Sequence, residues 1–207
     1  MTLSKIGIVF VLAAGPCLAA QITSIASPTF TENYDGPGIV ALFPNTCGGQ
    51  ACANTPLTIN GVTYTASSGQ IRFLPNDNGC GFTNCLNTST DLGSITITFA
   101  TLQAQVLIGF FQTFGNNQVQ FFGASNNLLG TITNGGADLL GWADASGIKS
   151  VTLTDTAANI SSSLLDNISA QELPGQGGGG TATPEPSSML LLGCGLAALA
   201  MRRGSRI

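Results

Sequence analysis

The sequence contains no histidine and little charge of either sign. Its 207 residues include six lysines and arginines and ten aspartates and glutamates, so charged residues make up 8%, against roughly 25% in ordinary soluble domains. Without histidine, Ser/His/Asp and Cys/His catalytic arrangements cannot be built. Residues 20–183 hold two basic residues against nine acidic ones, whereas nucleic-acid binding needs a positive surface. Histidine-dependent nucleophilic catalysis and nucleic-acid binding are therefore unexpected functions.

A pair of carboxylates is the one common catalytic device that this composition still permits. Two acids suffice for glycoside hydrolysis, and the candidates are Glu32, Asp77, Asp91, Asp138 and Asp144. No spacing in the sequence brings two of them together, so a glycoside hydrolase is a remote alternative. We predict a non-enzymatic protein with no catalytic residues.

The first twenty residues have the order of parts of a secretory signal peptide. Lys5 precedes an apolar stretch at 6–14, then a Gly-Pro pair and the small residues Ala19 and Ala20, as such signals require. We expect cleavage after Ala19 or Ala20, and hence an exported protein.

The C-terminus has three ordered parts: Pro184-Glu185-Pro186, a thirteen-residue apolar run at 189–201, and Arg202-Arg203. A helix needs about 20 apolar residues to cross a bilayer, so the run predicts a marginal transmembrane helix. The arginines favour a cytoplasmic location for the end of the chain. A plain C-terminal membrane anchor is one interpretation of this pattern.

The three parts in this order resemble the PEP-CTERM sorting signal of exported bacterial proteins. The resemblance implies processing by exosortase, a membrane transpeptidase that cuts near the motif, and delivery to the cell surface or its polysaccharide matrix. Four segments follow: a signal peptide at 1–20, a domain at 21–172, a Gly-rich linker at 173–183 and the sorting signal at 184–207.

Four cysteines remain after the signal peptide, in two pairs of equal spacing: Cys47 with Cys52, and Cys80 with Cys85. In an exported chain an even number of cysteines indicates disulfides. We expect the two local pairs, since Gly-rich intervals can turn back on themselves. A bridge between the loops and a four-cysteine zinc site are the alternatives.

The dominant sequence period is two, which is typical of strands with one buried face. Residues 95–99 and 151–154 alternate apolar and hydroxyl side chains, 106–111 indicates a more buried strand, and 137–145 shows a weak helical spacing. We predict a mostly β, antiparallel sandwich. The strand candidates at 95–99, 107–110, 119–122, 127–131, 147–153 and 165–169 resemble the jelly-roll β-sandwich found ahead of such tails. That family is similar to carbohydrate-binding modules, which implies a binding or surface domain and extracellular polysaccharide as a partner.

Asp166 interrupts an apolar strand face that also holds Leu164, Ile168 and Ala170. Related jelly-roll modules place such an acid beside a structural calcium, and the resemblance implies Glu32 and Asp35 as its partners. Calcium takes six to eight oxygen ligands. The alternative is that Asp166 caps backbone amides at the rim of the sheet.

Trp142, Tyr34 and Tyr64 are the aromatic candidates for stacking on sugar rings, with core packing as the simpler alternative. Thr-x-Thr units at Thr96, Thr131 and Thr152 resemble the threonine ladders of ice-binding sheets. We expect three scattered units on different strands, without a ladder, because threonine is common on solvent-facing strands.

Overall fold

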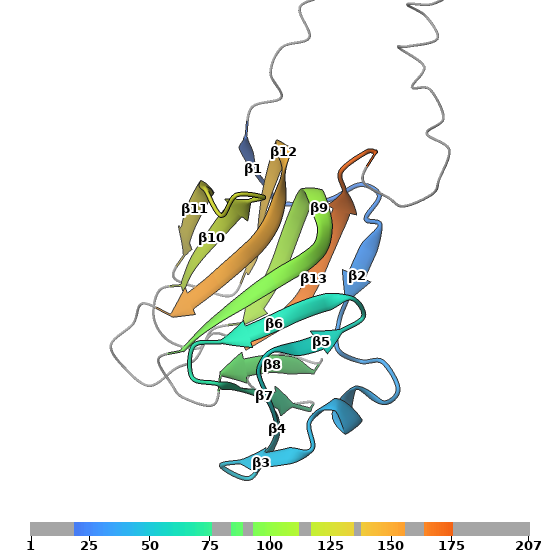
Figure 1. Cartoon of the computed structure of the whole chain (residues 1–207), viewed down its shortest axis with the longest axis vertical. Helices are drawn as coiled ribbons and strands as arrows, with labels where there is room; N and C mark the ends of the chain where they lie inside the picture. The colour runs from blue at the N-terminus through green and yellow to red at the C-terminus, as the bar shows by residue number, and fades with distance from the viewer. Residues whose placement is uncertain are drawn as a thin grey trace, which may run out of the picture. The chain divides into compact units, whose positions relative to one another are not determined.

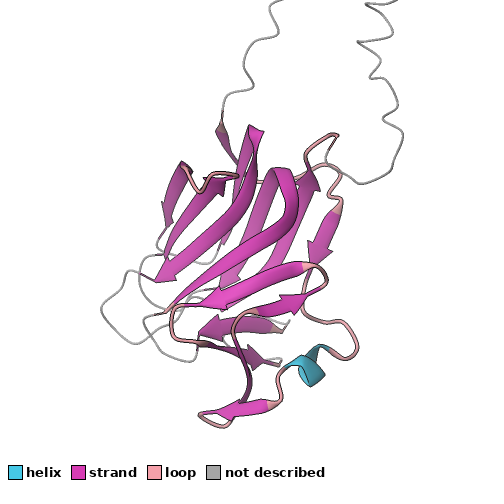
Figure 2. Cartoon of the chain, in the orientation of Figure 1, coloured by secondary structure: helices cyan, strands magenta, loops and turns pink. Residues whose placement is uncertain are grey.

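The structure, a computed structural model, describes residues 19–75, 84–88, 93–111, 117–134, 138–155 and 164–175, and in these it is almost entirely β (Figures 1 and 2). The elements are β1 (Ala20–Ile22), β2 (Phe30–Glu32), a 3-10 helix η1 (Ile39–Leu42), β3 (Asn45–Cys47), β4 (Gln50–Asn54), β5 (Leu57–Ile59), β6 (Val62–Ala66), β7 (Gln70–Leu74), β8 (Cys85–Thr88), β9 (Ser94–Phe111), β10 (Asn117–Gly123), β11 (Leu128–Asn134), β12 (Asp138–Asp155) and β13 (Leu164–Glu172). The prediction of a mostly β, antiparallel sandwich is confirmed.

Two long strands, β9 and β12, connect the two layers of the sandwich (Figure 1). The first part of β9 pairs with β6 and with the last part of β12, which in turn pairs with β10. The last part of β9 pairs with β13 and with the first part of β12, which also pairs with β1. The first layer is therefore β5-β6-β9-β12-β10-β11, and the second contains β1-β12-β9-β13 with β2, β8, β7, β4 and β3.

The corner where both strands bend depends on a glycine. The β9–β12 register shifts between Ala143 and Ile148. Here Gly147 has φ +90°, and a Cβ on it would lie 2.8 Å from Leu102 Cβ, so a larger residue is excluded by both conformation and space. Lys149 Nζ donates to the Ala100 carbonyl at 2.8 Å across the same corner. The two strands predicted at 95–99 and 106–111 are the two halves of one bent strand, β9. The weakly helical segment at 137–145 overlaps the start of β12.

The core lies between the layers, as the period of two predicts. Ile95, Ile97 and Phe99 are buried, whereas Thr96 and Thr98 between them are only half-buried on the outer side. Full burial of one such apolar side chain contributes roughly 1.5–3 kcal/mol. These alternating strands therefore supply the main stabilisation of the sandwich.

A disulfide joins Cys47 to Cys52 across the β3–β4 hairpin. Gly48 and Gly49 form the intervening turn with φ of 57° and 85°, a conformation that glycine adopts at little cost. The predicted local pairing is thus confirmed for this pair. Cys85 is also disulfide-bonded, and Cys80 lies outside the described residues.

The expectation of scattered Thr-x-Thr units is wrong. Thr96 pairs with Thr152, Thr152 with Gln120, and Gln120 with Thr131, so the three threonines lie in one row across adjacent strands. The register that aligns them comes from pairing between distant segments, which sequence spacing does not reveal.

All the described residues belong to one compact unit, which lies within 1–176. The described residues contain no helix with the length and hydrophobicity for crossing a membrane. The apolar run at 189–201, the linker glycines and residues 1–18 of the predicted signal peptide lie outside them. Strand β1 begins at Ala20, which pairs with Ala143, so cleavage after Ala19 would preserve the whole strand.

Candidate functional site

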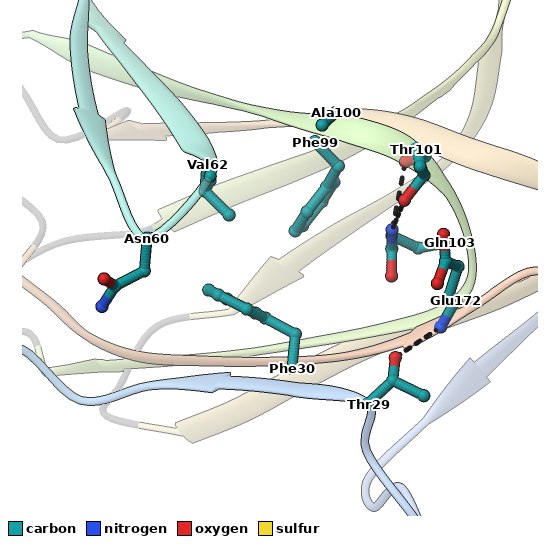
Figure 3. Close-up of a pocket in the computed structure, with 10 residues that line it drawn as sticks. Thr29, Phe30, Asn60, Val62, Phe99, Ala100, Thr101, Gln103 and Glu172 are labelled. Atoms are coloured by element: carbon teal, nitrogen blue, oxygen red, sulfur yellow. Dashed lines mark hydrogen bonds between the residues drawn. The ribbon is translucent and has the colours of Figure 1, made fainter. Parts of the chain in front are cut away.

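A small cavity opens between the β5–β6 turn and the bend of β9 (Figure 3). Its volume is about 210 Å³, below the roughly 300–1,000 Å³ of pockets for drug-sized ligands. It therefore has room for one ring-sized ligand. Its lining residues are Thr29, Phe30, Asn60, Gly61, Val62, Phe99, Ala100, Thr101, Gln103 and Glu172.

The cavity combines an apolar side with a polar side. Phe30 and Phe99 lie on one side, and Thr101, Gln103 and Glu172 lie on the other (Figure 3). Gln103 is only 5% exposed, and its Nε2 donates to the Thr101 carbonyl at 3.0 Å and the Thr101 hydroxyl at 3.1 Å. The amide is thereby held in one orientation. Aromatic carbon beside fixed amide and hydroxyl groups is chemistry that suits a neutral polar ring.

A buried polar cluster adjoins this cavity through Asn60. Glu32 is 4% exposed; one carboxylate oxygen accepts from the Tyr34 backbone N–H at 2.8 Å, and the other accepts from the Asn60 amide at 2.5 Å. Tyr34, at φ 58°, donates through its hydroxyl to the Tyr64 hydroxyl at 3.3 Å. Glu32 therefore anchors the loop after β2 to the β5–β6 turn.

The two tyrosines of this cluster are core residues. Both are 0% exposed, and their rings meet edge to face at a centroid distance of 6.1 Å. Burial is the largest cause that raises the pKa of both phenols, and the Glu32 carboxylate raises them further. In this structure their rings offer no surface to a ligand, and the core-packing alternative describes them.

The acids considered for calcium have other partners. Asp35 accepts from the Asn84 amide at 2.8 Å, and Asp166 accepts from the Asn167 amide at 3.1 Å. The β13–β9 register shifts between Leu165 and Asn167, so the simple alternation assumed for Asp166 is broken there and the residue is half-buried. Within the described ranges, no group of three or more His, Cys, Asp or Glu side chains is placed to hold a metal ion. Calcium binding is therefore the less favoured of the two alternatives for Asp166, and chelation tests it.

Trp142 is half-buried and packs against the core of the sandwich. Its ring stacks on Phe121 with centroids 5.8 Å apart and an interplanar angle of 22°, and it lies against Gly130, where a Cβ would be 2.3 Å from Cζ2. Its indole N–H is buried without a hydrogen-bond partner in the described part of the chain. Packing thus accounts for the ring, and sugar stacking by Trp142 stays a prediction.

Two of the five acids considered for glycoside hydrolysis, Glu32 and Asp144, accept hydrogen bonds in the structure. Glu32 is held by amides, and Asp144 accepts from the Ser146 backbone N–H at 2.8 Å. Asp77 and Asp91 lie outside the described residues.

The cavity residues Gln103 and Thr101 were missed because nothing in the sequence distinguishes them from other polar strand residues. Only the bend of β9 brings them to the cavity.

The prediction of a PEP-CTERM sorting signal is confirmed by the family comparison. Residues 182–204 match the PEP-CTERM protein-sorting motif, so Pro184, Glu185, Pro186, Arg202 and Arg203 belong to a sorting signal. The motif implies export and exosortase processing. No curated protein sequence matches the chain.

Several solved structures are similar to this chain at low identity. A glycoside hydrolase family 43 arabinoxylan arabinofuranohydrolase from Bacillus subtilis, in complex with cellotetraose, is 13% identical over 59% of this chain and 27% of its own, with a TM-score of 0.36. CsCBM6-3 from Clostridium stercorarium, in complex with cellobiose, is 14% identical over 59% and 94%, with a TM-score of 0.34. An exo-beta-1,3-galactanase from Phanerochaete chrysosporium, with galactose, is 14% identical over 71% and 30%, with a TM-score of 0.32. Likeness at this level carries no information about the ligand or activity of this chain.

Proposed function

We propose that this chain is a non-enzymatic surface or matrix protein, released from its membrane-bound form by exosortase, with a structural or adhesive role. The observation that carries the proposal is the PEP-CTERM motif at 182–204. The domain ahead of it is an antiparallel sandwich, and residues 20–183 hold two basic residues against nine acidic ones, a composition that suits an extracellular module. The apolar run at 189–201 holds the protein in the membrane until it is processed.

Changing the motif tests the processing step. In a host with an exosortase, the wild-type protein should lose its apolar run, detected by intact mass, and should appear at the cell surface. The double variant Pro184→Ala, Pro186→Ala should retain the run and stay in the membrane fraction. Thr181→Ala, just before the motif, is the matched control. Equal processing of the wild type and the double variant would refute the proposal.

A carbohydrate-binding module with a defined sugar site is the second candidate, and the cavity beside Phe30 and Gln103 favours it. The side-chain change Thr101→Val removes one cavity hydroxyl, yet Gln103 keeps its bond to the Thr101 carbonyl. On a glycan array, this candidate predicts sugar-specific binding that Thr101→Val weakens and that Thr46→Val, an exposed change on β3, leaves intact. Silence across the array, or binding that ignores Thr101, would exclude the cavity.

A further inference from the structure

The outer side of the first layer carries hydroxyl and amide side chains in register on neighbouring strands. Its central row runs across five strands as Thr65, Thr96, Thr152, Gln120 and Thr131. A second row contains Ser94, Thr154, Gln118 and Thr133, and a third contains Thr63, Thr98 and Ser150, followed by Phe122 and Leu128. We call these three rows the hydroxyl face.

The hydroxyl face is neutral and open to solvent. None of its residues is charged, although the chain has a net charge of −4, and each is half-buried or exposed, as outward positions of a sheet are. Thr96 and Thr152 share a hydrogen bond between their hydroxyls at 3.0 Å. Because a hydroxyl both donates and accepts, this pair still offers bonding capacity to a ligand.

The face also has an apolar end. Phe122 is half-buried, and Leu128 next to it is 54% exposed. Hydroxyls beside exposed carbon match the two kinds of surface that a neutral sugar presents, its hydroxyl groups and its C–H groups.

The dimensions of the face favour a long, flexible ligand. Strands lie about 4.8 Å apart and outward residues repeat about every 6.8 Å along a strand, so the central row is about 19 Å long. Neighbouring strands rotate by about 20°, and five strands therefore accumulate about 80° of twist. A rigid flat solid, such as a crystal of ice, would touch only part of such a surface, whereas a polymer chain can follow it.

We propose that the hydroxyl face binds a neutral polysaccharide chain lying across the strands along the central row. This inference rests on the proposed adhesive function, and it assigns that function to a surface separate from the cavity. Neutral ligands are selected because the face has no charge to pair with a carboxylate or a sulfate, and the acidic protein as a whole repels polyanions.

Affinity electrophoresis of the full chain, purified in a neutral detergent, tests the inference. The gels contain hydroxyethyl cellulose or galactomannan as neutral probes and alginate as the anionic probe. The double variant Thr96→Val, Thr152→Val removes both partners of one hydrogen bond and leaves no unpaired hydroxyl, and valine keeps the strand preference of threonine. The matched control is Thr31→Val, Thr46→Val, two exposed strand threonines outside the face.

We expect at least one neutral probe to retard the wild type and the control. The double variant should bind about ten-fold more weakly, with an unchanged melting temperature. Gln120→Ala, a second variant in the same row, should weaken binding in the same direction. Equal retardation of all variants, equal retardation by alginate, or no retardation by either neutral probe would overturn the inference, as would thermal hysteresis in freezing solutions without retardation.

The result of this binding test can be distinguished from the result of the processing test. A chain that is processed and delivered to the surface but is not retarded refutes the hydroxyl face alone. A chain that is retarded but never processed refutes the proposed processing alone.

Discussion

Replacing Gly130 with alanine should place a methyl group inside the ring of Trp142. The new Cβ would lie 2.3 Å from Cζ2 and 2.4 Å from Cη2, which no real contact allows, so the indole must move. The indole is held by its stack on Phe121. Overpacking of this kind costs about 1–3 kcal/mol, which corresponds to a fall of about 2–12 °C in melting temperature for a chain of this size.

The effect of Gly130→Ala on stability should change sign when the indole ring of Trp142 is absent. With Trp142→Leu the space beside residue 130 is open, and alanine is better than glycine in a strand by about 0.5–1 kcal/mol. Gly130→Ala should therefore stabilise the Trp142→Leu protein, although it destabilises the wild type. The coupling energy between the two positions is then about 1.5–4 kcal/mol.

Urea denaturation of the four proteins, followed by far-UV circular dichroism, measures this coupling as a double-mutant cycle. Trp142 is the only tryptophan in the chain, so its fluorescence independently reports whether the ring has moved in Gly130→Ala. If the two changes add to within about 0.5 kcal/mol, the indole does not occupy the space beside Gly130. In that case the packing role assigned to Trp142 is wrong.

Three further predictions concern the buried polar groups and the hairpin. Burial raises the pKa of Tyr34 and Tyr64, so the folded state keeps both phenols protonated. Their contribution to stability should be constant below the unfolded pKa of about 10 and fall as pH rises above it. These are the only tyrosines in the chain, so phenolate absorbance should appear only with unfolding; a gradual rise in the folded protein would contradict their burial. EDTA should leave the melting temperature unchanged, because both Glu32 oxygens already accept hydrogen bonds; a loss that added calcium restores would support the calcium site instead. The double change Cys47→Ser, Cys52→Ser should cost about 2 kcal/mol through the short loop that the disulfide closes, and an unchanged urea midpoint would show that the bridge adds no stability.

The faces of the strands could be predicted from the sequence, but their neighbours could not. Alternation at 95–99 correctly assigns Ile95 and Ile97 to the core and Thr96 to the outside, because side-chain direction in a strand depends only on local geometry. Strand order and register depend on which distant segments meet. The two strands predicted at 95–99 and 106–111 form the single strand β9, and its bend lies beside Gly147 of β12, where a Cβ would meet Leu102. No local pattern specifies this neighbour.

The candidate residues show the same division between local and non-local information. The disulfide between Cys47 and Cys52 and the sorting motif at 182–204 could be found from the sequence, because each is a contiguous pattern. The environment of Tyr34 could not, since it includes contacts with Tyr64 and Asn84, which lie 30 and 50 residues away in the sequence. An aromatic residue in a loop has no sequence feature that distinguishes a ligand platform from a core side chain.

The proposed delivery by the C-terminal tail would compensate for the weak binding expected of a single hydroxyl face. One neutral hydrogen bond contributes only about 0.5–1.5 kcal/mol net, while association costs about 4–15 kcal/mol in lost freedom of motion, so a single hydroxyl face binds weakly. Under the proposed binding, many copies concentrated on one cell surface would engage one polysaccharide together, and linkage of this kind raises overall affinity by about 10² to 10⁴. Weak neutral contacts would be of little use to a freely diffusing monomer, and they suit a protein whose C-terminal signal gathers it at a surface.

Beads carrying many copies of the full chain should therefore bind a neutral polysaccharide far more tightly than the same chain in solution. The Thr96→Val, Thr152→Val variant should lose most of that difference.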